Sequence, residues 1–295
     1  MSRKPISAWA RTPKGLLLLL LLPLAVWAAL GPGWRLALPG LAAAALAAAA
    51  ADVLFMRWRP ILDAGQKRAW IFPDGALLTG LLVAMVLSEH EPWTYAAATA
   101  VVAIASKRLF RTRYANLFNP AAFGLVVTFY WLHTGQDWWG AMAQLPVWSL
   151  LAVAVVGGFI AYRINKLPMV LSFLGLYFAL ATLATTWDAA GVAELFRYPD
   201  APATLFFALF ILTDPPTSPT RHRNQIVCGT LVALVAFVCF EWVGSAYYLL
   251  AGVLVGNVWE AARRWWRDGQ RLRRPRVSPP SGARLLDGAP LPVRH

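Results

Sequence analysis

Charged residues are scarce in this sequence. Only 14% of its 295 residues are Asp, Glu, Lys or Arg, whereas 59% are hydrophobic. An ordinary soluble domain has about a quarter charged residues and about half apolar ones. A chain this apolar could not cover its own core with polar surface in water. The composition therefore predicts a protein whose solvent is lipid for most of its length.

Cysteine and histidine are also rare, which limits the chemistry. The two cysteines, Cys228 and Cys239, lie in one apolar run and form neither a CxxC metal motif nor a disulfide framework. The four histidines are scattered without ligand spacing: His90, His133, His222 and His295. We therefore expect no metal site. No Ser/His/Asp, Cys/His, HExxH or Walker pattern is present, which argues against a hydrolytic enzyme.

Long apolar runs are abundant instead. Ten are candidate membrane spans: 15–31, 36–56, 74–88, 93–106, 120–134, 146–162, 168–186, 201–213, 225–242 and 244–261. A bilayer core of about 30 Å needs about 20 apolar residues in a helix. Four runs are shorter and are expected to be shielded by neighbouring helices or to be discontinuous: 74–88, 93–106, 120–134 and 201–213. The sequence predicts an all-α, polytopic membrane domain.

Three segments are expected along the chain: a cytoplasmic N-terminus at 1–14, a transmembrane domain at 15–262, and a basic, disordered cytoplasmic tail at 263–295. Because ten spans could be two inverted halves of five, repeats at 15–134 and 146–261 are considered. Pro73-Asp74 opens the third span and Pro199-Asp200 the eighth, as a repeat requires. Two shared residues are also compatible with chance.

The positions of the basic residues predict the orientation. Lys and Arg number 27 against 14 Asp and Glu, and with a cytoplasmic N-terminus all but Arg35 and Arg197 fall in cytoplasmic segments. The external segments carry acids instead: Glu89, Glu91, Asp137, Asp188, Glu194 and Glu241. This alternation predicts that both termini lie in the cytoplasm. The membrane is expected to be a bacterial inner membrane. Basic loops between apolar runs suit an anionic lipid leaflet and argue against a nucleic-acid partner.

Residues near the span ends support this arrangement. Nine tryptophans are expected at the lipid headgroups: Trp34, Trp58, Trp93, Trp138, Trp139, Trp187, Trp242, Trp265 and Trp266. Acids inside the spans are scarce. Asp52 lies about one turn before Arg57, and we expect the two to form an interfacial ion pair. The scarcity argues against a pump driven by intramembrane carboxylates.

Three polar motifs converge on the predicted cytoplasmic side. Asn119-Pro120 is typical of an N-cap followed by the first helical residue, and Asp214 can cap a turn begun at Pro215. Basic loops at 107–113 and 221–223 add positive charge. Together they suit a phosphate or another anionic group, although they also suit plain helix stops and topology signals. The candidate cofactor-binding residues are Lys107, Arg108, Asn119, Pro120, Asp214, Thr217, Ser218 and Arg221.

The stretches NLFNPAAFGLV (116–126) and FILTDPPTSPTRHR (210–223) resemble the RnfD/NqrB family. This family comprises the RnfD components of Rnf-type electron-transport complexes and the NqrB components of sodium-pumping NADH:quinone reductase. The resemblance extends over about residues 65–262, through 74–82, 157–163 and 250–257. It implies ten helices in two inverted halves, inside a multi-subunit complex that passes electrons through flavins and couples this to ion movement. The partners so implied are other membrane subunits and flavoproteins.

One feature departs from the family pattern. Ion-pumping members carry a covalent FMN on a threonine of an S-[GQ]-A-T motif, whereas the loop at 133–144 is short and contains no such motif. Covalent FMN is therefore not expected. We expect a non-covalent flavin, FMN or riboflavin, near Asn119 and Asp214 or on a partner, and at most an electron-carrying role. The alternatives are a redox-independent small-molecule transporter or permease on the same scaffold, and a scaffold role in a membrane complex.

Overall fold

The computed structural model describes residues 12–57, 73–111, 116–190, 193 and 200–273. Throughout these residues the regular structure is helical, with two isolated β-bridges and no strand. The all-α prediction is confirmed. The chain divides into two units at Ala261 and Ala262, and the site described below lies within the first unit.

In the described residues of the first half of the chain there are five helices. They are α2 (Pro13–Ala28), α3 (Trp34–Arg57), α4 (Asp74–Val86), α5 (Trp93–Leu109) and α6 (Pro120–Leu132). Each coincides with one of the first five predicted runs. Local capping explains two of the starts, because Thr12 Oγ1 accepts the amide of Gly15 and Asn119 Oδ1 accepts the amide of Ala122.

A short 3-10 turn, η1 (Trp139–Ala141), leads into the second half. Among the described residues its elements are α7 (Ser149–Arg163), α8 (Leu167–Ala184), α10 (Asp200–Phe206), the π-helix η2 (Phe207–Ile211), α11 (His222–Glu241) and α12 (Tyr248–Arg273). Each of the last five predicted runs therefore contains a helix. Because α12 continues to Arg273, residues 263–273 are helical where the sequence predicts disorder; the rest of that tail lies outside the described residues.

Three helices in the described part of the chain are long and apolar enough to cross a membrane by length and composition: Trp34–Met56, Leu167–Ala184 and His222–Glu241. Two of the short runs are enclosed by protein, as expected. In α4 every residue from Leu78 to Val86 is buried, and all five residues of η2 are buried. Burial by neighbouring helices supplies the apolar surroundings that a short helix cannot obtain from lipid alone.

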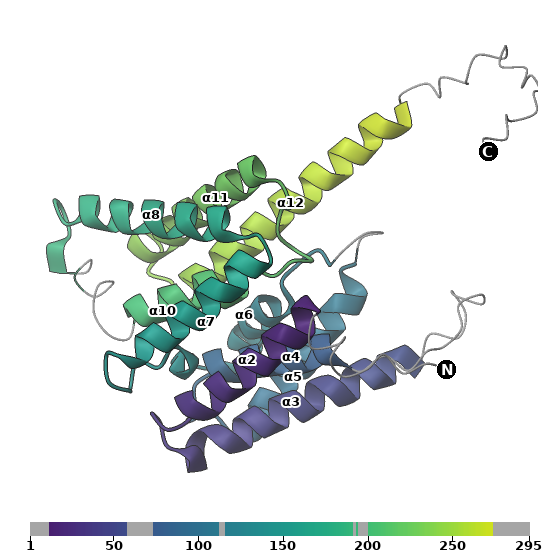
Figure 1. Cartoon of the computed structure of the whole chain (residues 1–295), viewed down its shortest axis with the longest axis vertical. Coiled ribbons are helices and arrows are strands. Elements are labelled where there is room, and N and C mark those ends of the chain that lie inside the picture. The colour runs from purple at the N-terminus through teal and green to yellow at the C-terminus, as the bar shows by residue number, and fades with distance from the viewer. Residues whose placement is uncertain (1–11, 58–72, 112–115, 191–192, 194–199, 274–295) are drawn as a thin grey trace, which may run out of the picture. The chain divides into compact units, whose positions relative to one another are not determined.

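Two pairs of helices have extensive contacts. α3 lies against α5, and α8 lies against α11 (Figure 1). A Cβ at Gly124 of α6 would lie 2.9 Å from a carbonyl oxygen of α5, and a Cβ at Gly252 of α12 would lie 2.9 Å from a carbonyl oxygen of α11. Only glycine permits such an approach of one helix to the next backbone.

One expectation about individual side chains is corrected by the structure. Trp138 and Trp139 are only 8% and 2% exposed, because the segment before η1 folds inward and Trp138 contacts the rings of Phe206 and Phe207. Of the remaining predicted headgroup tryptophans, Trp58 lies outside the described residues and the others are exposed: Trp34, Trp93, Trp187, Trp242, Trp265 and Trp266. Asp52 pairs with Arg108 of α5 at 2.7 Å, because α3 packs against α5; the side chain of Arg57, its predicted partner, lies outside the described residues.

Candidate functional site

Asn119 joins three segments that are far apart in the sequence. Its Oδ1 accepts the amide of Ala122, its Nδ2 donates to the carbonyl of Ile211 at 2.9 Å, and its backbone N–H donates to Oδ1 of Asn257 at 2.7 Å. Asn119 is buried, and Pro120 is the first helical residue, so the predicted N-cap is confirmed. The start of α6 is thereby tied to the end of η2 and to α12.

Asp214 organises the turn that follows η2. Its carbonyl accepts the amides of Thr217 and Ser218 at 3.2 and 3.1 Å, and its carboxylate Oδ2 accepts the hydroxyl of Thr217 at 2.9 Å. The predicted capping turn after Asp214 is present, but the carboxylate takes a side-chain hydroxyl instead of a backbone amide. Asn257 Nδ2 donates to the carbonyl of Thr217 at 3.4 Å. We call the set Asn119, Ile211, Asp214, Thr217 and Asn257 the Asn119 junction.

Three lysines lie near this junction, close enough for their charges to act on Asp214. Lys107 Nζ donates to the carbonyl of Gly75 and to the hydroxyl of Thr79, both at 2.7 Å, and Lys166 Nζ donates to the carbonyl of Pro219 at 2.6 Å. Lys14 lies close to the same part of α4, since its Nζ would be 3.4 Å from a Cβ at Gly75. The junction therefore has a rim of positive charge contributed by α2, α5 and the α7–α8 connection.

The electrostatics of Asp214 reflect two opposing effects. Burial raises the pKa of the Asp214 carboxyl, because the charged form loses solvent. The hydroxyl of Thr217 and the charges of Lys107, Lys14 and Lys166 act in the opposite direction and do not fully offset burial. Folding therefore favours the protonated form of Asp214 relative to its form in the unfolded chain.

Six of the eight predicted site residues come together here: Lys107, Asn119, Pro120, Asp214, Thr217 and Ser218. The other two do not contribute to the junction, because Arg108 is paired with Asp52 and Arg221 is exposed where it precedes α11. Sequence reasoning missed Asn257 and Lys166. A signal for Asn257 exists, since it is the one amide in the apolar stretch 248–258.

The chemistry of this arrangement has two parts. The side-chain hydrogen bonds of three residues are made to other protein groups and hold the helix ends in place: Asn119, Thr217 and Ser218. Lys14 and Lys107 of the lysine rim lie beside the first turn of α4, where the helix dipole also favours negative charge. An anionic group can therefore be held at the rim, while the junction keeps the helices in place.

Comparison with known proteins gives a consistent result. Residues 11–144 and 134–262 match the family described as NQR2, RnfD, RnfE. The chain is 26% identical over 288 residues to the RnfD component of the ion-translocating oxidoreductase complex of Pseudomonas aeruginosa strain LESB58, covering 77% of this chain and 81% of the relative. The protein of the same name from Citrobacter koseri is 25% identical over 291 residues, covering 74% and 81%.

Proposed function

Because the chain belongs to the NQR2, RnfD, RnfE family, we propose that it is a membrane subunit of a bacterial electron-transport complex of the ion-translocating oxidoreductase type. The observation that carries this proposal is the family match over residues 11–262, which includes both polar motifs of the Asn119 junction. Relatives that share this length of chain are named as components of such complexes. Other membrane subunits and flavoproteins would be its partners.

In this proposal the ten helical segments cross the inner membrane as two inverted halves, with both termini in the cytoplasm. Support for the repeat comes from the matching packing of α3 on α5 and α8 on α11, and from the glycine contacts of α6 and α12. Support for the orientation comes from the basic residues. Labelling of single cysteines at positions 137 and 223 from opposite sides of the membrane tests it, since equal labelling from one side would exclude this topology.

The proposed cofactor is a non-covalent flavin, and its fit to the residues is partial. The side-chain hydrogen bonds of Asn119 and Thr217 are used between helices and do not suit a flavin ring. The rim suits the phosphate of FMN, which Lys14 and Lys107 would hold by charge and hydrogen bonding. A flavin bound there would accept and pass on electrons. The role of the chain's own residues is to bind the phosphate and to keep the helix ends fixed.

Flavin analysis of the purified full chain tests the cofactor. We expect FMN that is released by acid or detergent denaturation, and no fluorescent band on a denaturing gel. Lys107→Ala should lower the FMN content several-fold, whereas Arg223→Ala, which changes an exposed arginine at the start of α11, should not. Absence of flavin from the chain and from its purified assembly would contradict the flavin part of the proposal.

A second candidate function rests on the short loop at 133–144, which lacks the covalent-flavin motif. On this view the same scaffold moves a small molecule without redox chemistry. Uptake into proteoliposomes that contain only this chain, at a rate independent of any electron donor, would favour the transporter. Uptake or ion movement that requires an electron donor would favour the redox role.

A further inference from the structure

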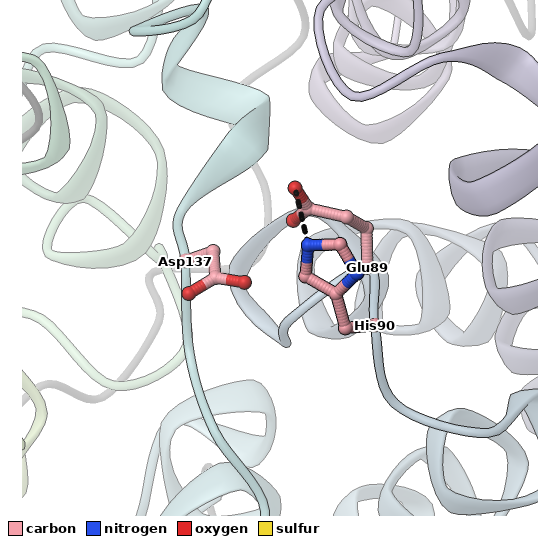
Figure 2. A group of neighbouring side chains, drawn as sticks. All are labelled: Glu89, His90 and Asp137. Atoms are coloured by element: carbon pink, nitrogen blue, oxygen red, sulfur yellow. Dashed lines mark ion pairs between the residues drawn. The ribbon is translucent and has the colours of Figure 1, made fainter.

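A cluster of ligand side chains lies at the far end of α4 and α6 from the Asn119 junction. Glu89 and His90 follow the end of α4, and Asp137 follows the end of α6. One ligand atom from each lies within 4.8 Å of the other two. Figure 2 shows the three side chains converging from two chain segments, with the Asp137 carboxylate directed toward the other two.

Glu89 is the unusual member of the cluster. Its side chain is only 3% exposed, and its Oε2 is buried without a hydrogen-bond partner in the described part of the chain. Its other oxygen accepts Gln144 Nε2 at 2.9 Å and lies 3.9 Å from His90 Nε2. A buried carboxylate oxygen with no donor is costly unless a cation or another donor compensates it.

The local backbone holds the two segments in register. Leu87 and Gln136 form an antiparallel bridge, and the Ser88 amide donates to the carbonyl of Gly135 at 3.1 Å. The hydroxyl of Ser88 donates to Asp137 Oδ2, so the carboxylate is oriented by a neighbour from the opposite segment. The backbone bridge and the Ser88–Gly135 bond involve none of the three ligand side chains, and they bring the two segments that carry them together.

The surrounding electrostatics favour a cation. Both α4 and α6 end next to the cluster, and helix C-termini carry partial negative charge. The nearby carboxylate of Glu91 accepts the amide of Gly135 at 2.7 Å and adds further negative charge. No lysine or arginine lies in the segments 87–92 and 133–144 that build the cluster. Lys14 and Lys107 lie at the opposite end of α4.

We propose that Glu89, His90 and Asp137 form a binding site for a divalent transition-metal ion of the Zn2+ type. Imidazole nitrogen and carboxylate oxygen are both ligands of Zn2+, and a site with three protein ligands leaves a fourth position to water or another ligand. Zinc ligands at about 2 Å from the ion lie about 3.3 Å apart, so the side chains need to close only slightly. His90, 71% exposed, is free to make that adjustment. The ion would tie the loop after α4 to the segment after α6.

Equilibrium dialysis of the full chain with Zn2+, after removal of any histidine tag, tests this site. We expect one tightly bound Zn2+ per chain, no competition by excess Mg2+, and a rise in unfolding temperature with Zn2+. His90→Gln and Asp137→Asn should each weaken binding at least about tenfold, since even indirect support of a metal site is worth about 10- to 100-fold. His90 is exposed, so its replacement is not expected to impair folding.

His133→Asn is the matched control. His133 lies at the end of α6, outside the cluster, with a φ of 55° that asparagine tolerates. Retention of the tight site in His133→Asn and its loss in His90→Gln would support the proposal. Equal Zn2+ binding by the wild-type chain, His90→Gln and Asp137→Asn would overturn it, as would the absence of a tight site in the wild-type chain. None of these outcomes depends on a flavin or on electron transfer.

Discussion

Replacement of Asn119 tests whether the Asn119 junction holds the helices together. Asn119→Ala removes the N-cap of α6, a loss of about 1 kcal/mol. It also removes the hydrogen bond from Nδ2 to Ile211, and such interhelical bonds in membrane proteins are worth about 0.6 kcal/mol and at most about 1.7. The expected total loss in the free energy of unfolding is about 1.5–3 kcal/mol.

Asn119→Ser separates the two contributions. Serine retains an N-cap acceptor for the Ala122 amide but lacks the amide group that reaches Ile211. It should therefore lose only the interhelical part, about 0.6–1.7 kcal/mol. Thermal unfolding in detergent, followed by tryptophan fluorescence, measures both variants, at about 2–4 °C per kcal/mol for a domain of this size. Equal midpoints for wild type, serine and alanine variants would refute the reasoning.

Three further predictions concern packing and charge. Gly229→Ala should lower the free energy of unfolding by about 1–3 kcal/mol, because its Cβ would lie 2.5 Å from a carbonyl oxygen of α8. Gly175→Ala should not be destabilised, because there is open space around Gly175. Thermal unfolding midpoints compare the two variants. Asp52→Ala and Arg108→Ala should show a coupling of about 1–2 kcal/mol in a double-mutant cycle, because both side chains are about four-fifths buried; additive losses would contradict this. Burial raises the pKa of Asp214 in the folded chain above its unfolded value of about 4, so the free energy of unfolding falls as pH rises from that value to the folded pKa. Asp214→Asn should flatten this pH dependence of the unfolding midpoint. An unchanged pH profile in Asp214→Asn would exclude Asp214 as its cause.

Local sequence signals were sufficient for the helices and for part of the site. The apolar runs located each helical segment, because both lipid and the protein core require continuous apolar stretches. The N-cap at Asn119 followed from Asn-Pro before an apolar run, since its physics involves neighbours only three residues apart. The pairing of Asn119 with the Asp214 segment followed from the predicted topology, in which both motifs lie on one side.

Features that depend on tertiary contacts could not be read from local patterns. The interhelical position of Asn257 depends on how α12 meets the start of α6, and the ion pair of Asp52 depends on the packing of α3 on α5. Trp138 follows an apolar run but folds into the core. The approach of Asp137 to His90 joins residues 47 positions apart through a backbone bridge that no short motif indicates.

Purification of the full chain from its native membranes tests the central claim most directly. In mild detergent the chain should be recovered in a multi-subunit assembly whose flavin is reduced by an electron donor and reoxidised by an acceptor, and this turnover should be lost from membranes that lack the chain. Recovery of the chain without any flavoprotein partner, together with unchanged electron transfer in membranes that lack it, would contradict its assignment to an electron-transport complex.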